Sequence, residues 1–161
     1  MAIQEGEKIP ELTLKTPNAE GMPEDITTAA LFGGKKVVVF AVPGAFTPLC
    51  SAQHLPGFIE KAAAIKAKGV DTIACLAVND AFVMGAWGKD RGAGNDVLML
   101  ADGNGELTRE LGLEMDVSVA GLGLRSQRFA MVVDDGVVSK LAVEAPQKFE
   151  VSSADAILAA L

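Results

Sequence analysis

Cys50 and Cys75 are the two side chains of this sequence best suited to nucleophilic or redox chemistry. Cys50 follows an apolar run and a loop that contains Pro43 and Gly44, at the expected start of a helix. Unsatisfied N–H groups and the helix dipole favour an anion at such a position, and therefore favour the ionised thiol. A thiolate in this setting is able to attack the O–O bond of a peroxide or to exchange with a disulfide.

The residues around Cys50 narrow this chemistry. Pro43, Thr47 and Cys50 form the pattern P-x-x-x-T-x-x-C within the string PGAFTPLCSAQHLPGF, which runs from Pro43 to Phe58. This string closely resembles the active-site motif of peroxiredoxins, in particular of the type II or peroxiredoxin 5-like subfamily. The segments VDTIACLAVNDAFVMGAW (70–87) and RFAMVVDDGVV (128–138) also resemble that subfamily, so the resemblance covers essentially the whole chain.

The resemblance implies a thiol-dependent peroxidase that reduces hydrogen peroxide and organic hydroperoxides through a sulfenic acid on Cys50. Thr47 then offers a hydroxyl that bonds the sulfur and the peroxide, and Pro43 shapes and shields the pocket. Arg128 supplies a guanidinium with fixed donors for the charge that develops on the leaving oxygen. Arg125 is the nearest alternative for this role.

Cys75 lies in the middle of an apolar run, where a free cysteine usually acts as a small hydrophobic residue. Plant-like members of the subfamily carry a second cysteine at the matching place, which implies that Cys75 resolves the oxidised Cys50. Other members use an external reductant, so glutaredoxin with glutathione, or thioredoxin, is expected as the thiol partner. The sequence leaves both routes open.

The subfamily commonly forms homodimers through the face that bears the active-site loop, and the resemblance implies the same here. His54, the only histidine, lies beside the active-site helix in that family, where it has a structural or modulatory role. The residues expected to line the pocket or contact the partner are Gly44, Phe46, His54, Phe82 and Leu122.

Other activities find little support. A thioredoxin-type disulfide reductase needs C-x-x-C, and Gln53 occupies the second cysteine position. A zinc site built from Cys50, His54 and Cys75 would lack the paired close spacing of structural zinc sites. No motif implies a metal, flavin, haem or nucleotide cofactor. A non-enzymatic redox sensor that passes Cys50 oxidation to a partner protein remains the alternative function.

Length and composition limit the domain number, the binding partners and the location that can be expected. The 161 residues suit one domain spanning 1–161, and half of them are hydrophobic. The formal net charge of -7 disfavours binding to nucleic acid or to an anionic membrane. No apolar run approaches the roughly 20 residues that a membrane span needs, and the N-terminus has no signal-peptide pattern. A cytoplasmic protein is expected.

The order of apolar runs predicts an α/β protein with a thioredoxin-like fold, in which helices flank a central mixed β-sheet. Buried strands are expected at 36–42, 71–78 and 97–101, and a hairpin at 128–133 and 137–143 turns at Asp134-Asp135-Gly136. Helices are expected at 55–68, at 106–111 and at 154–161, the last with a capping box at Ser152. A further helix is expected to begin after Asn79 and Asp80, which are its possible caps. The polar opening before residue 36 is given no helix or strand, and 115–124 is expected to be a loop.

Overall fold

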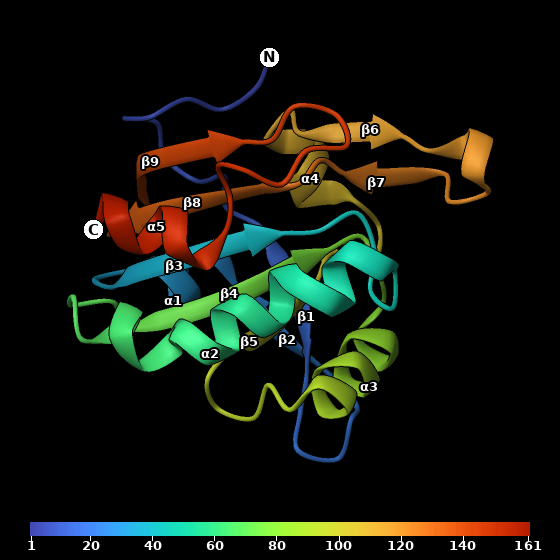
Figure 1. Ribbon diagram of the computed structural model, residues 1–161, viewed down its shortest axis with the longest axis horizontal. Helices are drawn as coiled ribbons and strands as arrows, with labels where there is room; N and C mark the ends of the chain where they lie inside the picture. The colour runs from blue at the N-terminus through green and yellow to red at the C-terminus, as the bar shows by residue number, and fades with distance from the viewer.

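The computed structural model describes residues 1–161 and has a seven-stranded mixed sheet at its centre (Figure 1). The strand order across this sheet is β2-β1-β5-β4-β3-β8-β9. β3 pairs in parallel with β4, and β4 with β5, whereas the other neighbours are antiparallel. The strands are β1 (Thr13–Pro17), β2 (Pro23–Thr27), β3 (Lys36–Ala41), β4 (Thr72–Ala77), β5 (Leu98–Ala101), β8 (Phe129–Asp134) and β9 (Val137–Val143).

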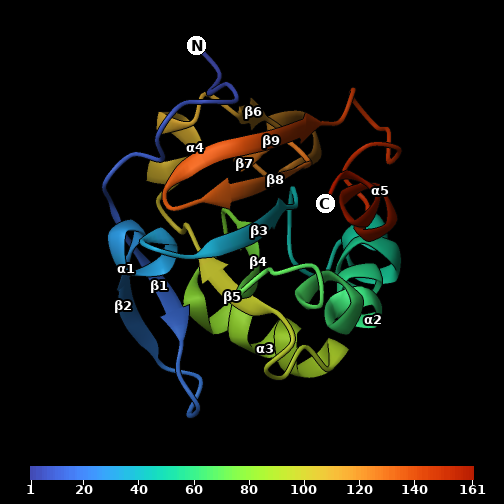
Figure 2. The same cartoon turned by 90° about the vertical axis from the view of Figure 1, so that its left-hand side faces the viewer.

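Helices cover both faces of the sheet because its central strands bury side chains on both faces. Along β3, Val38 and Phe40 join one cluster of buried residues, and Val37 and Val39 join a second. Figure 2 shows α2 and α5 on the opposite side of the sheet from α1 and α4. The first cluster packs under α2 (Leu55–Lys66), α3 (Ala81–Arg91) and α5 (Ala154–Ala160), and the second under α1 (Thr28–Phe32) and α4 (Glu106–Glu110). The expected mixed sheet flanked by helices is confirmed.

Turn and cap residues behave largely as their types predict. The Asp80 side chain accepts a hydrogen bond from the Val83 N–H and caps α3. The β8–β9 hairpin turns at Asp135 and Gly136, whose φ angles of 47° and 81° are both positive, as a two-residue turn of this kind requires. The cap of α5 was misassigned: Ser153, and not Ser152, accepts the N–H of Ala156, because the Ser152 hydroxyl donates to Glu144 instead.

Two regions in which the sequence predicted no helix or strand contain regular structure. The opening segment forms the β1–β2 hairpin and α1. In β1 only Leu14 and Thr16 are buried, so the apolar signal of this strand is weak. The 115–124 segment was predicted as a loop, but it holds most of a small hairpin, β6 (Glu114–Asp116) and β7 (Leu124–Ser126), with a 3-10 turn at Ser118–Ala120. Strands of three residues are too short to show a period.

The topology brings distant segments to one edge of the sheet. β8 runs antiparallel to β3 and pairs Phe129 with Ala41, so Arg128 lies beside the end of β3 that leads into the Cys50 loop. β9 runs antiparallel to β8 and pairs Val143 with Phe129, which brings Glu144 to the same edge. No helix is long and apolar enough to cross a membrane.

Candidate active site

Cys50 lies in the first turn of the helix that continues into α2. The Ser51 N–H donates to the Thr47 carbonyl at 2.9 Å, which starts the helix at Pro48, where proline is favoured. Residues Cys50–His54 form a π-helical turn, in which the Cys50 carbonyl accepts the Leu55 N–H. Such turns are rare and concentrate at functional sites. The Cys50 side chain is fully buried, and the first-turn N–H groups around it favour an anion.

The guanidinium of Arg128 is the charged group nearest to the reacting atom of this site. Its Nη2 donates to the Cys50 Sγ at 3.1 Å. Arg128 forms no salt bridge. The arrangement therefore places a cation that is not ion-paired against the sulfur, where it stabilises a thiolate.

The alternative guanidinium, that of Arg125, binds the backbone of the Cys50 loop and not the Cys50 sulfur. Its Nε donates to the Leu122 carbonyl at 2.9 Å and its Nη1 to the Pro43 carbonyl at 3.3 Å. A Cβ atom at Gly44 would lie 2.9 Å from the Arg125 Nη1, so glycine is needed for this approach. Arg125 holds the loop backbone and makes no hydrogen bond with Cys50.

Thr47 is placed by the same loop, but its hydroxyl contacts differ from the expectation. The Thr47 Oγ1 donates to the Gly44 carbonyl at 2.6 Å, and it forms no hydrogen bond with the Cys50 sulfur. Its oxygen lone pairs are left to accept a hydrogen bond from a bound molecule. Asn79, expected as a helix cap, instead accepts the Ala45 N–H at 3.0 Å and fixes the loop to the end of β4.

His54 lies behind Arg128 and is fully buried. Its Nδ1 is 2.9 Å from the Arg128 Nη1, and its Nε2 is 2.9 Å from the Ser152 carbonyl oxygen. Burial lowers the pKa of His54 to about 3, and the positive charge of Arg128 acts in the same direction, although the hydrogen bond to Ser152 raises it. His54 is therefore neutral at physiological pH.

Cys75 lies on β4, directly opposite Phe40 of β3, and is completely buried in the same apolar cluster as Cys50. Both thiols are free. Burial raises the pKa of the Cys75 thiol well above its ordinary value, and a negative charge on Cys50 raises it further, with Arg128 opposing. In this conformation Cys75 stays protonated and is a weak nucleophile.

A cavity of about 420 Å³ opens beside the site, against Pro43, Leu49 and Arg128. Residues 145–148, from the loop between β9 and α5, line its other side. This cavity gives a small molecule access to the guanidinium and to the loop that carries Cys50.

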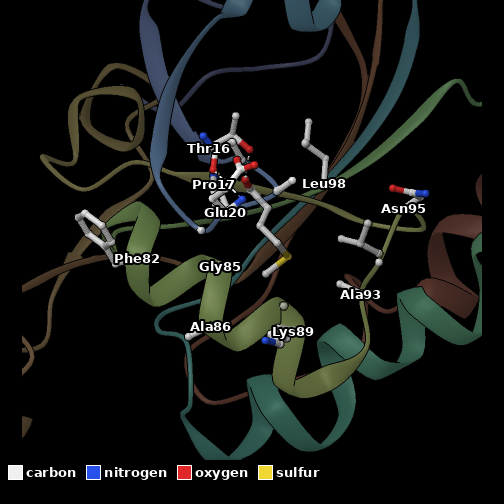
Figure 3. Close-up of a pocket in the computed structure, with 17 residues that line it drawn as sticks. Thr16, Pro17, Glu20, Phe82, Gly85, Ala86, Lys89, Ala93, Asn95 and Leu98 are labelled. Atoms are coloured by element: carbon white, nitrogen blue, oxygen red, sulfur yellow. Dashed lines mark hydrogen bonds between the residues drawn. The ribbon is translucent and has the colours of Figure 1, made fainter.

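The largest cavity of the structure, about 730 Å³, lies elsewhere, between the β1–β2 turn and α3 (Figure 3). Its lining includes Pro17, Phe82 and Gly85, and its only charged side chains are those of Glu20 and Lys89. It contains no cysteine, so it offers no thiol for peroxide chemistry. The smaller cavity, by contrast, is lined by Arg128 and by Pro43 and Leu49 of the loop that leads to Cys50.

Three residues expected at a pocket or partner contact lie away from the sulfur. Phe46 is 53% exposed and Phe82 is 55% exposed, which is unusual for phenylalanine, and Leu122 is half-buried. Phe46 also has a φ of 62°, a strained value for an aromatic residue, and its ring lies 6.5 Å from that of Trp87. Phe46 lies in the Cys50 loop, Phe82 in the first turn of α3 and Leu122 in the turn between β6 and β7, and together we call these three side chains the exposed rim.

One part of the site, the Glu144 carboxylate, could not be predicted from the sequence. Glu144 is buried, and its carboxylate accepts the N–H groups of Glu150, Val151 and Ser152 as well as the Ser152 hydroxyl, at 2.6–2.9 Å. Burial raises the pKa of Glu144, but these hydrogen bonds outweigh it and the net pKa is lowered. Glu144 follows a strand and precedes a polar loop, as many solvated acids do. Across the whole chain, no group of three or more His, Cys, Asp or Glu side chains is arranged to hold a metal ion.

Comparison with known proteins identifies the family of this site. A family model described as Redoxin matches residues 4–158. Peroxiredoxin-2E-2, chloroplastic, of Oryza sativa subsp. japonica is 56% identical over 163 residues, which cover 99% of this chain and 72% of the relative. The chain belongs to the peroxiredoxin family.

Other peroxiredoxins match this chain over nearly its full length. Peroxiredoxin-2B of Arabidopsis thaliana is 50% identical over 159 residues, covering 99% of this chain and 98% of the relative. The crystal structure of reduced Prx3 in complex with H2O2 from Vibrio vulnificus has a TM-score of 0.94 and 55% identity, covering 98% of each chain. The resemblance to peroxiredoxins and the thioredoxin-like redoxin fold are thereby confirmed, and the chain is a thiol-dependent peroxidase. The cytoplasmic location stays a prediction, since some of these relatives are named as chloroplastic.

Proposed function

We propose that this peroxiredoxin reduces hydrogen peroxide and organic hydroperoxides through a sulfenic acid on Cys50, which a thiol reductant then returns to the thiol. The Cys50 thiolate attacks one peroxide oxygen, the O–O bond breaks, and the second oxygen leaves as hydroxide or alkoxide and takes up a proton. The sulfur is oxidised and the peroxide becomes water or an alcohol. A second thiol then condenses with the sulfenic acid, releasing water, and a further thiol reduces the disulfide.

One observation carries this proposal: the Arg128 Nη2 lies 3.1 Å from the Cys50 Sγ. An arginine that forms no salt bridge offers its charge to the thiolate before the reaction and to the leaving oxygen during it. This preorganised cation supports attack by sulfur on an electrophilic oxygen. The Vibrio vulnificus relative, whose structure holds H2O2, supports the same choice of substrate.

Thr47 and Pro43 complete the proposed peroxide site. Because the Thr47 hydroxyl donates to the Gly44 carbonyl, its lone pairs accept the O–H of the peroxide. That bond aligns the O–O axis with the sulfur, which is a large part of the catalytic task. Pro43 lines the cavity wall beside Arg128, where it excludes water. Because proline has no backbone N–H, it does not compete with Arg128 for hydrogen bonds to the peroxide.

Two routes reset the oxidised enzyme, and we favour the internal one, in which Cys75 forms a disulfide with Cys50. Both thiols lie in one buried cluster, which supports a short path between them. Because Cys75 is buried and protonated, the first turn of the Cys50 helix must open before the disulfide forms. Glutaredoxin with glutathione, or thioredoxin, would then reduce that disulfide. In the second route the same reductants react directly with the sulfenic acid.

We also expect a homodimer, with Phe46, Phe82 and Leu122 close to the partner subunit. The exposure of the two phenylalanines supports this face, because large exposed aromatic side chains are favoured at interfaces.

The test of the proposed function is steady-state peroxide consumption with three reducing systems: thioredoxin, glutaredoxin with glutathione, and glutathione alone. The proposal predicts turnover over many cycles with at least one of them, for hydrogen peroxide and for an alkyl hydroperoxide. Oxidation of one equivalent without turnover in every system would support a redox sensor instead.

A further inference from the structure

His54 binds both to the guanidinium of Arg128 and to the protein backbone. Arg128 donates through its Nη2 to the Cys50 Sγ at 3.1 Å and through its Nη1 to the His54 Nδ1 at 2.9 Å. An arginine side chain has four rotatable bonds, and the Phe149 ring, whose centroid lies 5.9 Å from the Arg128 Cζ, offers it no directional hydrogen bond. The second contact fixes the plane of the guanidinium.

The hydrogen-bond partners of His54 admit only one form of its ring. Arg128 is a donor without lone pairs, so the Nδ1 must accept from it. The Ser152 carbonyl is an acceptor, so the Nε2, at 2.9 Å, must carry the proton and donate. A protonated ring would place an N–H against the guanidinium, which has only donors to offer. The geometry therefore requires a neutral imidazole with its proton on Nε2.

A neutral acceptor has a specific advantage at this place. Arginines in proteins are commonly oriented by carboxylates, which cancel part of their charge. Arg128 forms no salt bridge, and its side-chain acceptor partners are the imidazole and the sulfur. The imidazole fixes the guanidinium while leaving its charge for the thiolate and the leaving oxygen.

The ring of His54 is itself held firmly. Phe40, Phe58 and Phe149 surround it, with ring centroids at 5.0, 5.7 and 4.9 Å. Ser152, which accepts from its Nε2, is held in turn by the Glu144 carboxylate through both its N–H and its hydroxyl. The position of the guanidinium is thus determined by a chain of hydrogen bonds that ends on a buried, fully bonded carboxylate.

We propose that His54 is a positioning residue for peroxide reduction, whose Nδ1 lone pair orients the Arg128 guanidinium onto the Cys50 sulfur without neutralising its charge. The proposal rests on the proposed function, because it assigns the group that orients Arg128 for that reaction. It goes beyond a packing role for the histidine, since it requires an acceptor at one named atom.

A set of variants separates this role from packing. His54→Phe keeps a ring and deletes the acceptor, whereas the Oδ1 of Asn in His54→Asn coincides with the Nδ1 of His and retains it. Two readouts are needed: the single-turnover rate of Cys50 with hydrogen peroxide, and the pH at which its thiolate absorbance appears. We expect His54→Phe to lower the rate about tenfold and to move the thiolate absorbance to higher pH, and His54→Asn to stay within about threefold of the wild-type rate.

A double-mutant cycle with Arg128→Met gives the decisive result, because a residue that acts through Arg128 has nothing to orient once Arg128 is gone. His54→Phe should then change the rate by less than about twofold in the Arg128→Met background. Equal slowing with and without Arg128, or equal slowing by His54→Phe and His54→Asn, would overturn the proposal. His54→Leu repeats the deletion if the phenylalanine ring is not accommodated. The thiolate readout needs no peroxide, so a wild-type enzyme that fails to reduce peroxide would contradict the proposed function separately.

Discussion

The Nη2 of Arg128 lies 3.1 Å from the Sγ of Cys50, although 78 residues separate them in the sequence. The contact follows from the antiparallel pairing of β8 with β3, which places the residue preceding β8 at the end of β3 that leads into the Cys50 loop. The central feature of this site is this contact, in which the sheet positions the Arg128 cation and the first helical turn positions the Cys50 thiol.

Replacing Arg128 by Met should lower the rate of peroxide reduction by about 10² or more, because it removes one preorganised donor to the leaving oxygen and the cation beside the thiolate. The measurement is the second-order rate constant with hydrogen peroxide. Arg125→Met is the matched control, since Arg125 bonds the Leu122 and Pro43 carbonyls and makes no hydrogen bond with Cys50. If Arg125→Met slowed the enzyme by that amount and Arg128→Met did not, the guanidinium assignment would be wrong.

Acid should destabilise the fold in a way that depends on His54. Burial, aided by the charge of Arg128, lowers the pKa of this histidine from 6.5 to about 3 in the folded state. Between these two values the unfolded chain binds a proton that the folded chain does not bind. The free energy of unfolding therefore falls as the pH drops from 6.5 towards 3, by up to about 1.4 kcal/mol per pH unit from this residue.

Urea unfolding of the wild-type protein and of His54→Asn at several pH values in this window checks the expectation. The variant lacks the titrating ring, so its stability should fall less steeply than that of the wild type as the pH drops. Parallel pH dependences would contradict the neutral, buried histidine.

Peroxide treatment without a reductant should give an internal Cys50–Cys75 disulfide, if Cys75 resolves the sulfenic acid. Intact-mass measurement should show the loss of two hydrogen atoms with no crosslink between chains. Formation should be slower than peroxide attack, because the buried Cys75 is reached only after the first helical turn opens. Cys75→Ser should then accumulate the sulfenic acid. Full turnover of this variant with every reductant, together with no internal disulfide in the wild type, would leave Cys75 with a packing role alone.

The exposed rim should mediate self-association. Light scattering should give a mass near twice the chain mass of 16.7 kDa, because the rim exposes Phe46 and Phe82. Phe46→Asp introduces a charge at the rim and should shift the protein towards the monomer, whereas Val151→Asp changes another exposed apolar residue and should not. A mass of one chain at all working concentrations would rule out the dimer.

Much of the fold could be predicted because its central elements carry strong local signals. The continuous apolar run of β3 reflects burial on both faces of the sheet. The helical spacing of Phe58, Ala62 and Ile65 reflects burial of one face of α2. The β1–β2 and β6–β7 hairpins were missed, since their strands are short and bury few apolar side chains. Their pairing depends on neighbours and not on their own pattern.

The site likewise has a part that could be predicted from the sequence and a part that could not. Pro43, Thr47 and Cys50 lie within eight residues, so their spacing was visible in the sequence. The contacts among Cys50, Arg128, His54 and Ser152 arise only when β8, the helix start and the loop before α5 meet at one sheet edge. Glu144 binds Ser152 of that loop, and no residue pattern around Glu144 in the sequence indicates this contact. Such relations depend on topology, which no short motif encodes.

Peroxide consumption by Cys50→Ser, measured beside the wild type and Cys75→Ser with the same reductant, tests most directly whether Cys50 is the reacting thiol. A serine hydroxyl is not appreciably ionised near neutral pH and cannot take part in the thiol redox cycle. For Cys50→Ser we expect no consumption above the uncatalysed background, with an unchanged circular dichroism spectrum. For Cys75→Ser we expect the first peroxide equivalent to react at the wild-type rate. Consumption by a folded Cys50→Ser enzyme within a few-fold of the wild-type rate would contradict this role of Cys50.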